Sequence, residues 1–84
     1  MMKIDVRFFA SVREALGAAE TVDLGATADV GALRDMLTAR GGRYAETLGR
    51  HRVLRSARNR VLCAESVALA EGDEVGFFPP VTGG

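Results

Sequence analysis

The sequence predicts an α+β domain in which one amphipathic helix covers one face of a mixed β-sheet. Two patterns carry this prediction: apolar residues that alternate with polar ones, as in strands, and one apolar stripe at helical spacing. The chain has 84 residues, of which 48% are hydrophobic and 26% charged, a composition typical of one globular domain. Eleven basic residues balance eleven acidic ones, which argues against a dedicated nucleic-acid binder.

The first part of the chain predicts a strand, a short helix and a second strand. Apolar and charged residues alternate over residues 3–8, which is the period of a strand with one buried face. Ser11 and Glu14 have the spacing of a capping box. We therefore expect a helix over residues 11–16, followed by a strand over residues 20–24.

A longer helix is predicted in the middle of the chain. Asp29 can cap its first turn, and apolar residues then recur at helical spacing up to about Arg40. The expected buried stripe consists of Val30, Leu33, Met36 and Leu37. The glycine pair at 41–42 is expected to end this helix, and residues 44–48 add one more helical turn that Gly49 closes.

The second half of the chain predicts short strands. Residues 53–57 and 61–63 flank Asn59 and Arg60, which indicates a hairpin, although Asn-Arg is a weaker turn signal than Asn-Gly. A short apolar piece follows at residues 67–69.

The last strand is expected over residues 74–78, after a turn at residues 71–73. Pro79 and Pro80 stop it, because neither can donate to a sheet ladder. The element order is therefore strand, short helix, strand, long helix and three strand-like pieces. At this size, a β-grasp with a mixed sheet and one main helix on one face is the natural candidate.

Residues 1–78 are expected to form the β-grasp domain, and residues 79–84 an extended, flexible tail. The prolines favour an extended chain, and the stretch from Pro80 to Gly84 reaches at most about 15–18 Å. Gly83 and Gly84 have no side chain, so they can enter a channel too narrow for any Cβ atom.

The reactive group of such a tail is the α-carboxylate of Gly84. A carboxylate is a poor electrophile, but ATP can convert it into an acyl-adenylate, from which sulfide displaces AMP and leaves a thiocarboxylate. A terminal Gly-Gly alone is typical of a frayed end. The preceding Phe-Phe-Pro-Pro favours a working tail, because a frayed end needs neither two aromatics nor a double proline.

The stretch from Phe77 to Gly84, FFPPVTGG, resembles the C-terminal signature of the small subunits of molybdopterin synthase. Other stretches similar to that family are Arg7–Ala10, Val12–Glu14, Asn59 and Glu71–Val75. The resemblance covers essentially the whole chain, and the C-terminal motif is its most specific part. Arg58 departs from the family, which more often has an apolar residue at this position.

The resemblance implies a ubiquitin-like β-grasp sulfur carrier for molybdenum cofactor biosynthesis. An E1-like adenylyltransferase would use ATP to adenylate Gly84, and a sulfurtransferase system would convert the adenylate into a thiocarboxylate. In the large subunit of molybdopterin synthase, the sulfur would move to cyclic pyranopterin monophosphate and form the dithiolene of molybdopterin. A heterotetramer with its catalytic groups on the large subunit is implied. This chain would then be a sulfur-donating cosubstrate, not an enzyme on its own, with no permanently bound cofactor.

The residues expected to contact these partners are Phe78, Pro79, Pro80, Val81, Thr82 and Gly83. Phe78 should point away from Val75 and Phe77, because successive side chains of a strand alternate. If those two fill the core, Phe78 lies on the outer sheet face, where an exposed aromatic suggests a partner contact. A small second core under a loop is the alternative.

Other conspicuous residues have plainer interpretations. A basic run consists of Arg50, Arg52, Arg55, Arg58 and Arg60. It could steer the chain toward an acidic partner, but a solvated sheet face is the simpler expectation. Cys63 lies in an apolar run and is better explained as a small buried hydrophobe than as a sulfur relay. His51 is the only histidine and predicts no metal site.

The remaining features predict a cytoplasmic protein that binds neither membranes nor nucleic acid. The sequence has no apolar run long enough for a membrane span, no signal-peptide core and a single cysteine. Three other functions stay open: a sulfur carrier for thiamine synthesis or tRNA thiolation, a ubiquitin-like modifier joined through Gly84 to lysines, and a β-grasp binding module with an idle tail. Thiamine carriers are typically shorter and lack the Phe-Phe-Pro-Pro approach.

Overall fold

A five-stranded mixed sheet and three helices make up the computed structural model, which describes residues 2–25 and 28–80. The elements are β1 (Lys3–Phe8), α1 (Ala10–Leu16), β2 (Ala19–Asp23), α2 (Val30–Thr38), α3 (Gly42–Leu48), β3 (Arg55–Arg58), β4 (Val61–Cys63) and β5 (Glu74–Phe78). The strand order is β2-β1-β5-β3-β4. β1 and β5 run parallel and all other neighbours antiparallel, which confirms the predicted α+β architecture. No helix in the described part of the chain is long and apolar enough to cross a membrane.

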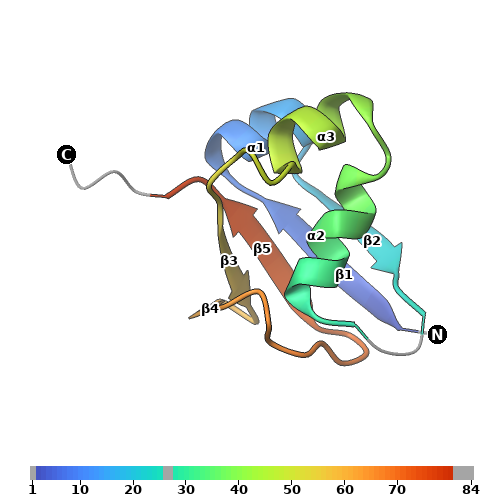
Figure 1. The fold of residues 1–84 in the computed structure, drawn as a ribbon. Helices are drawn as coiled ribbons and strands as arrows, with labels where there is room; N and C mark the ends of the chain where they lie inside the picture. The colour runs from blue at the N-terminus through green and yellow to red at the C-terminus, as the bar shows by residue number, and fades with distance from the viewer. Residues whose placement is uncertain (1, 26–27, 81–84) are drawn as a thin grey trace.

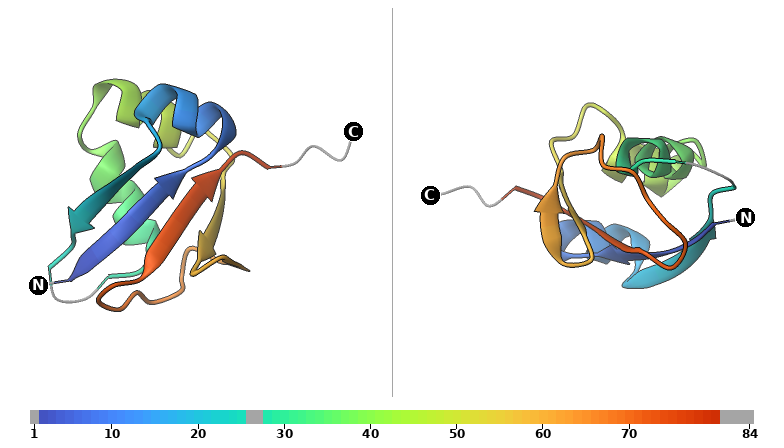
Figure 2. Two further views of the ribbon diagram at one scale, coloured as in Figure 1. Left: turned by 180° about the vertical axis from the view of Figure 1, so that it is seen from behind. Right: turned by 90° about the horizontal axis from the view of Figure 1, so that it is seen from below.

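The helices leave one face of the sheet open. Figure 1 shows α2 lying across the sheet, with α1 and α3 together at the end where β1 and β5 finish. Seen from behind, the strands lie in front of the helices (Figure 2, left). The expected main helix on one face is therefore confirmed, and the uncovered face is available for contacts with other molecules.

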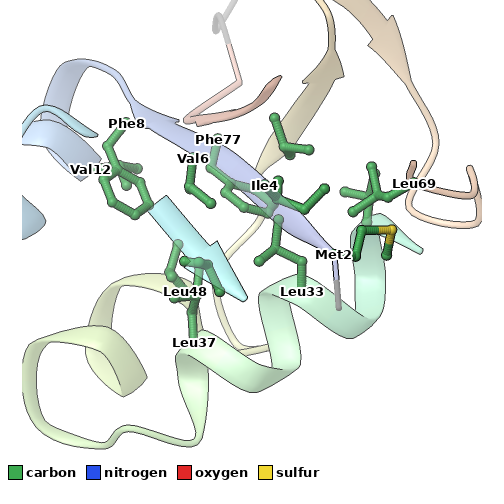
Figure 3. Packing of buried hydrophobic residues seen from close by; sticks show 13 residues of the cluster. Met2, Ile4, Val6, Phe8, Val12, Leu33, Leu37, Leu48, Leu69 and Phe77 are labelled. Atoms are coloured by element: carbon green, nitrogen blue, oxygen red, sulfur yellow. The ribbon is translucent and has the colours of Figure 1, made fainter. Parts of the chain in front are cut away.

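The parallel pairing of β1 with β5 joins the first and last strands in a fixed register. Val6 is paired with Val75, and Phe8 with Phe77. All four of these side chains are buried in the core, and Figure 3 shows Val6, Phe8 and Phe77 on the side of the sheet that the helices cover. Because side chains alternate along a strand, the next residue of each strand, Phe9 or Phe78, points to the open face.

The core is built from the apolar face of each element. Its buried members are Met2, Ile4, Val6, Phe8, Val12, Val22, Val30, Leu33, Leu37, Leu48, Leu69, Val75 and Phe77. The predicted helical stripe is largely confirmed, although Met36 is only partly buried. Leu48 shows that α3 is a full element of the core, where the sequence predicted a single extra turn.

The predicted capping box of α1 is wrong. The helix begins at Ala10, and no side chain caps it. Instead, the carbonyl of Phe9 accepts from the N–H groups of Val12 and Arg13 at 3.1 and 3.3 Å. Since the chain turns directly out of β1, with Ala10 at φ 53°, Ser11 already lies inside the first turn.

The cap of α2 is confirmed, but the boundary after it differs from the prediction. The Asp29 carboxylate accepts from the Ala32 N–H at 2.7 Å. The helix ends at Thr38, and Gly42 begins α3 instead of ending α2. Gly41, at φ 77°, makes the sharp turn between the two helices.

The predicted hairpin is also confirmed, with Asn59 and Arg60 both at positive φ, as its tight turn requires. Its first strand begins at Arg55, two residues later than predicted, and β2 spans residues 19–23, one residue earlier than predicted. Asp73 stabilises the turn, since its carboxylate accepts a hydrogen bond from the side-chain amide of Asn59 at 3.1 Å. The last strand, residues 74–78, agrees with the prediction.

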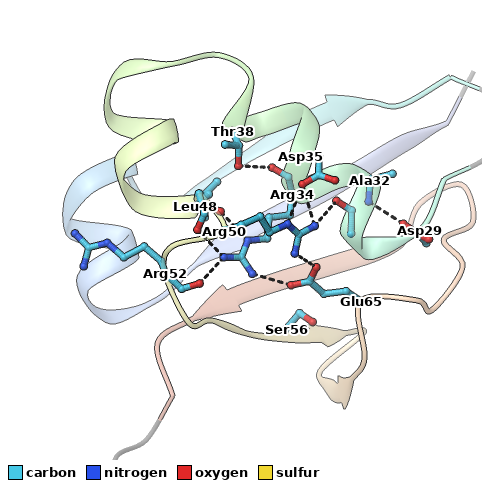
Figure 4. Close-up of polar contacts among 12 residues, drawn as sticks. Asp29, Ala32, Arg34, Asp35, Thr38, Leu48, Arg50, Arg52, Ser56 and Glu65 are labelled. Carbon is cyan, nitrogen blue, oxygen red and sulfur yellow. Dashed lines mark hydrogen bonds and ion pairs between the residues drawn. The ribbon is translucent and has the colours of Figure 1, made fainter.

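Arg34 is a buried charge at the centre of a polar network (Figure 4). Its side chain is on α2, yet the residue is 3% exposed. Its Nε donates to the carbonyl of Leu48 at 2.7 Å. Its Nη2 donates to the carbonyls of Gly49 and Arg52 at 2.9 and 2.7 Å, and its Nη1 bonds Glu65 at 2.7 Å. One guanidinium thus ties α2 to the end of α3, to the segment before β3 and to the segment after β4.

Glu65 is shared between two arginines. Arg50 donates to its other oxygen and also to Asp35, at 3.0 Å. Partial burial raises the pKa of Glu65, but the hydrogen bonds from Arg50 and Arg34 outweigh it, and the net pKa lies below the ordinary value of 4.5. The carboxylate is therefore charged at neutral pH, which leaves Arg34 with a charged partner.

Replacing Arg34 should destabilise the domain strongly. In Arg34→Met, three carbonyls lose a donor, two of them in buried hydrogen bonds, and Glu65 loses a partner, so we expect a loss of about 3 kcal/mol of unfolding free energy. Urea unfolding followed by far-UV circular dichroism measures this. The matched control, Arg43→Met at an exposed position of α3, should change stability by no more than about 0.5 kcal/mol. Equal effects at both positions would show that the network contributes little.

Asp73 should make the free energy of unfolding depend on pH. Burial raises its pKa, but hydrogen bonds from the Ala70 N–H, Asn59 and Arg58 outweigh it, so the pKa lies below the ordinary value of 3.8. A lowered folded-state pKa contributes stability above pH 3.8, and this contribution is lost as the pH falls through the folded-state pKa. Asp73→Asn should therefore be less stable than the parent at neutral pH and nearly equal to it in strong acid. Urea unfolding of both proteins between neutral pH and strong acid measures this. A difference in unfolding free energy between Asp73→Asn and the parent that stays constant over this pH range would contradict the assigned role of Asp73.

Candidate functional site

The tail leaves the domain from the middle of the sheet. β5 lies between β1 and β3, and it ends at Phe78. Phe78, Pro79 and Pro80 are each half-buried at this exit. The other tail residues predicted to act, Val81, Thr82, Gly83 and Gly84, lie outside the described residues, so their roles and the division into domain and tail stay predictions.

A groove of about 580 Å³ lies on the open face of the sheet beside this exit. Its apolar lining includes Phe9, Leu62, Gly76, Phe78, Pro79 and Pro80. Phe78 is on the outer face, as the alternation along β5 predicted. Its ring meets that of Phe9 edge to face, with centroids 6.4 Å apart and an interplanar angle of 82°. Because Phe9 is 46% and Leu62 65% exposed, this surface is an open groove and not a second core.

Gly76 makes the floor of the groove. A Cβ at this position would come within 2.9 Å of Cε2 of Phe9. The missing side chain thus lets the Phe9 ring approach β5 closely at Gly76. The groove therefore depends on one aromatic from each of the two central strands and one glycine between them.

Charged groups border the apolar surface. Arg60 and Glu74 line it, and their nearest side-chain atoms are 3.7 Å apart. Arg7 lies 3.7 Å from the same Glu74 carboxylate. The pKa of Arg7 is raised above its ordinary value by a hydrogen bond to Asp5 and by the charges of Asp5 and Glu74. The edge of the groove thus carries both positive and negative charges.

The basic run does not form one sheet face, contrary to the simpler expectation. Arg50 and Arg52 precede β3, and Arg50 belongs to the Glu65 network. Arg58 donates to Asp73 at 3.0 Å, which gives the departure from the family pattern a structural role. Steering by the run stays a prediction, with Arg55 and Arg60 exposed near the groove.

Cys63 and His51 have no sign of a chemical role in the described region. Cys63 is partly buried and packs against the core, and its carbonyl accepts from the hydroxyl of Ser56 at 3.1 Å. His51 is exposed. Within residues 2–25 and 28–80, no three His, Cys, Asp or Glu side chains are placed to hold a metal ion.

Sequence reasoning did not identify Phe9 and Leu62 as site residues. Phe9 directly follows β1 and Leu62 lies in β4, both distant in sequence from the tail, and only the strand order brings them beside Phe78. A signal was present for Phe9, because the doublet Phe8-Phe9 mirrors Phe77-Phe78. Leu62 lies in β4, which has only three residues. A strand this short has too few alternating residues to predict which face of the sheet the Leu62 side chain is on.

The mixed sheet with the last strand at its centre, the helix across one face and the apolar tail exit define a small ubiquitin-like β-grasp protein. The chain belongs to the ThiS family, with a match over residues 6–84. It is 43% identical over 81 residues to the molybdopterin synthase sulfur carrier subunit of Escherichia coli, covering 96% of this chain and 99% of that protein.

Two solved structures are similar along nearly the whole chain. In the complex of subunits 1 and 2 of the molybdopterin-converting factor from Helicobacter pylori, the matching chain gives a TM-score of 0.69 at 28% identity, covering 99% of this chain and all of that one. The small archaeal modifier protein 1 of Haloferax volcanii gives a TM-score of 0.77 at 26% identity, covering 96% of this chain and all of that one. The predicted fold and family are thereby confirmed.

Gly76→Ala should disturb the groove without disturbing the core. The added methyl group meets the Phe9 ring, which can move outward because it lies at the surface, so we expect only a small change in stability. Nuclear magnetic resonance should show changed ring-current shifts and weaker contacts between Phe9 and Phe78, while Val75 and Phe77 signals stay in place. Unchanged Phe9 signals would contradict this description of the groove floor.

Proposed function

We propose that this protein is the sulfur carrier of molybdopterin synthase, with the carboxyl group of Gly84 as its working group. The observation that supports this most directly is the position of β5. The central strand carries Pro79 and Pro80 away from the sheet beside an apolar groove, and the sequence then ends in two glycines. The names of the full-length relatives point to the same role.

The reaction begins with activation by an E1-like adenylyltransferase. A carboxylate oxygen of Gly84 attacks the α-phosphorus of ATP, and pyrophosphate leaves. The sulfur of a sulfide then attacks the acyl carbon, forming a C–S bond, while the C–O bond to AMP breaks and AMP leaves. The product is a thiocarboxylate, which is ionised and a soft nucleophile. The displacement of AMP by sulfide is neither an oxidation nor a reduction. A sulfurtransferase that supplies the sulfur belongs to the proposal.

The large subunit of the synthase is the second partner. The Helicobacter pylori complex of subunits 1 and 2 supports this pairing. The tail enters the large subunit, where the thiocarboxylate sulfur attacks a carbon of cyclic pyranopterin monophosphate and an oxygen substituent of that carbon leaves. Water then cleaves the bond between the acyl carbon and sulfur and restores the Gly84 carboxylate, and two such transfers build the dithiolene of molybdopterin. The acid–base groups of this step are assigned to the large subunit, in a heterotetramer, and this chain acts as a cosubstrate.

The groove on the open face is the surface that the partners share. Phe9, Leu62 and Phe78 offer apolar area beside the tail exit, and exposed aromatics in such patches commonly carry binding energy. A partner that covers the groove also fixes the direction in which the tail leaves the sheet. Docking at the groove therefore reduces the conformational freedom that the tail must lose before its carboxyl group reaches the reaction site.

A protein modifier is the second candidate. The likeness to small archaeal modifier protein 1 favours it, because the same acyl-adenylate can react with a lysine amine and form an amide as AMP leaves. The two functions differ in their product. A modifier gives covalent adducts visible on a denaturing gel, whereas the sulfur carrier gives a thiocarboxylate.

Changing the end of the chain should abolish sulfur transfer. Removal of Gly84, or addition of one residue after it, misplaces the carboxyl group, while the buried core ends at Phe77 and is left intact. Molybdopterin formation by the reconstituted synthase measures this, with circular dichroism as the check of folding. Thr21→Ser, at an exposed position on the far edge strand, is the control and should keep full activity. Full activity of the shortened chain would rule out the mechanism.

A further inference from the structure

A second hollow lies on the other side of the tail exit. It has a volume of about 190 Å³ and is lined by Ser11 and Ala15 of α1 and by Arg52, Val53 and Pro79, among others. Val53 is 75% exposed, more than any other large hydrophobic side chain in the described residues. An apolar residue this exposed beside a working tail suggests an unfilled contact.

The segment that presents Val53 is held in place from inside the domain. The carbonyl of Arg52, directly before it, accepts from the buried Arg34 at 2.7 Å. The Arg52 N–H donates to the carbonyl of Gly49 at 2.9 Å, and its Nε donates to the carbonyl of Glu46 at 3.1 Å. Figure 4 shows Arg52 held next to Arg34. A segment held in this way loses little conformational freedom on docking, so Val53 is presented in a preformed position.

Pro79 connects this hollow to the groove on the sheet face, because it lines both. A protein that covers both sides of Pro79 meets the groove on one side and the hollow with Val53 on the other. The two surfaces are continuous around the base of the tail.

We propose that the hollow around Val53 is a second docking surface for the large subunit of molybdopterin synthase, the protein that takes up the tail. This inference rests on the proposed function. The complementary patch is an apolar side chain that fills the hollow, with a carboxylate next to it that pairs with the exposed Arg52. The large subunit then contacts the base of the tail on both sides. Contacts with both surfaces restrict the direction of the tail more than contacts with the groove alone.

The size of the effect follows from the buried area. Docking would bury the exposed Val53 side chain and remove its apolar surface from water, and replacement by serine takes away most of this contribution. We therefore expect Val53→Ser to weaken binding of the large subunit about tenfold. Its unfolding midpoint should match that of the parent, since Val53 makes no part of the core.

Titration calorimetry of the full chain with the isolated large subunit tests the proposal. The matched control is Val61→Ser, because Val61 is 69% exposed and lines neither the groove nor the hollow. The affinity of this variant for the large subunit should stay within about twofold of the parent's. Leu62→Ser tests the groove in the same titration. If Val53→Ser behaves like Val61→Ser while Leu62→Ser weakens binding, the second surface is overturned and the proposed function stands. If the parent chain does not bind the large subunit, both are overturned.

Discussion

The parallel pairing of β1 with β5 is the constraint on which the rest of the structure depends. It places the last strand in the centre of the sheet, although it is the last element of the chain. It also aligns Phe8-Phe9 with Phe77-Phe78, so that one aromatic of each doublet enters the core and the other lies on the open face. The core and the candidate docking groove are therefore two sides of the same pair of strands, and neither can shift register without the other.

The buried Arg34 solves a problem of small domains. A chain of 84 residues has a limited apolar core, and the end of α3 and two connecting segments meet beside α2. One guanidinium with several donors in a fixed plane satisfies carbonyls at the end of α3 and in the segment before β3, and a carboxylate in the segment after β4. These hydrogen bonds hold the segment before β3 against α2, next to the base of the tail.

Local patterns predicted most of the fold, and long-range pairing decided the rest. The alternation in β1 and β5 and the Asp29 cap depend on neighbouring residues, so the sequence was sufficient for them. The burial of Arg34 was not predictable, because its acceptors come from residues 14 to 31 positions away. The start of α1 was misplaced because the Phe9 carbonyl, and not the Ser11 side chain, accepts the first helical hydrogen bonds. For the site, alternation placed Phe78 correctly, whereas Phe9 and Leu62 needed the strand order.

The intact mass of the protein, before and after incubation with an E1-like activating enzyme, ATP and sulfide, tests the central claim most directly. The account predicts a gain that matches exchange of one oxygen for sulfur, located in the C-terminal peptide that holds Gly84. An unchanged mass, with an activating enzyme that is active on a known carrier, would contradict the claim that this chain carries sulfur.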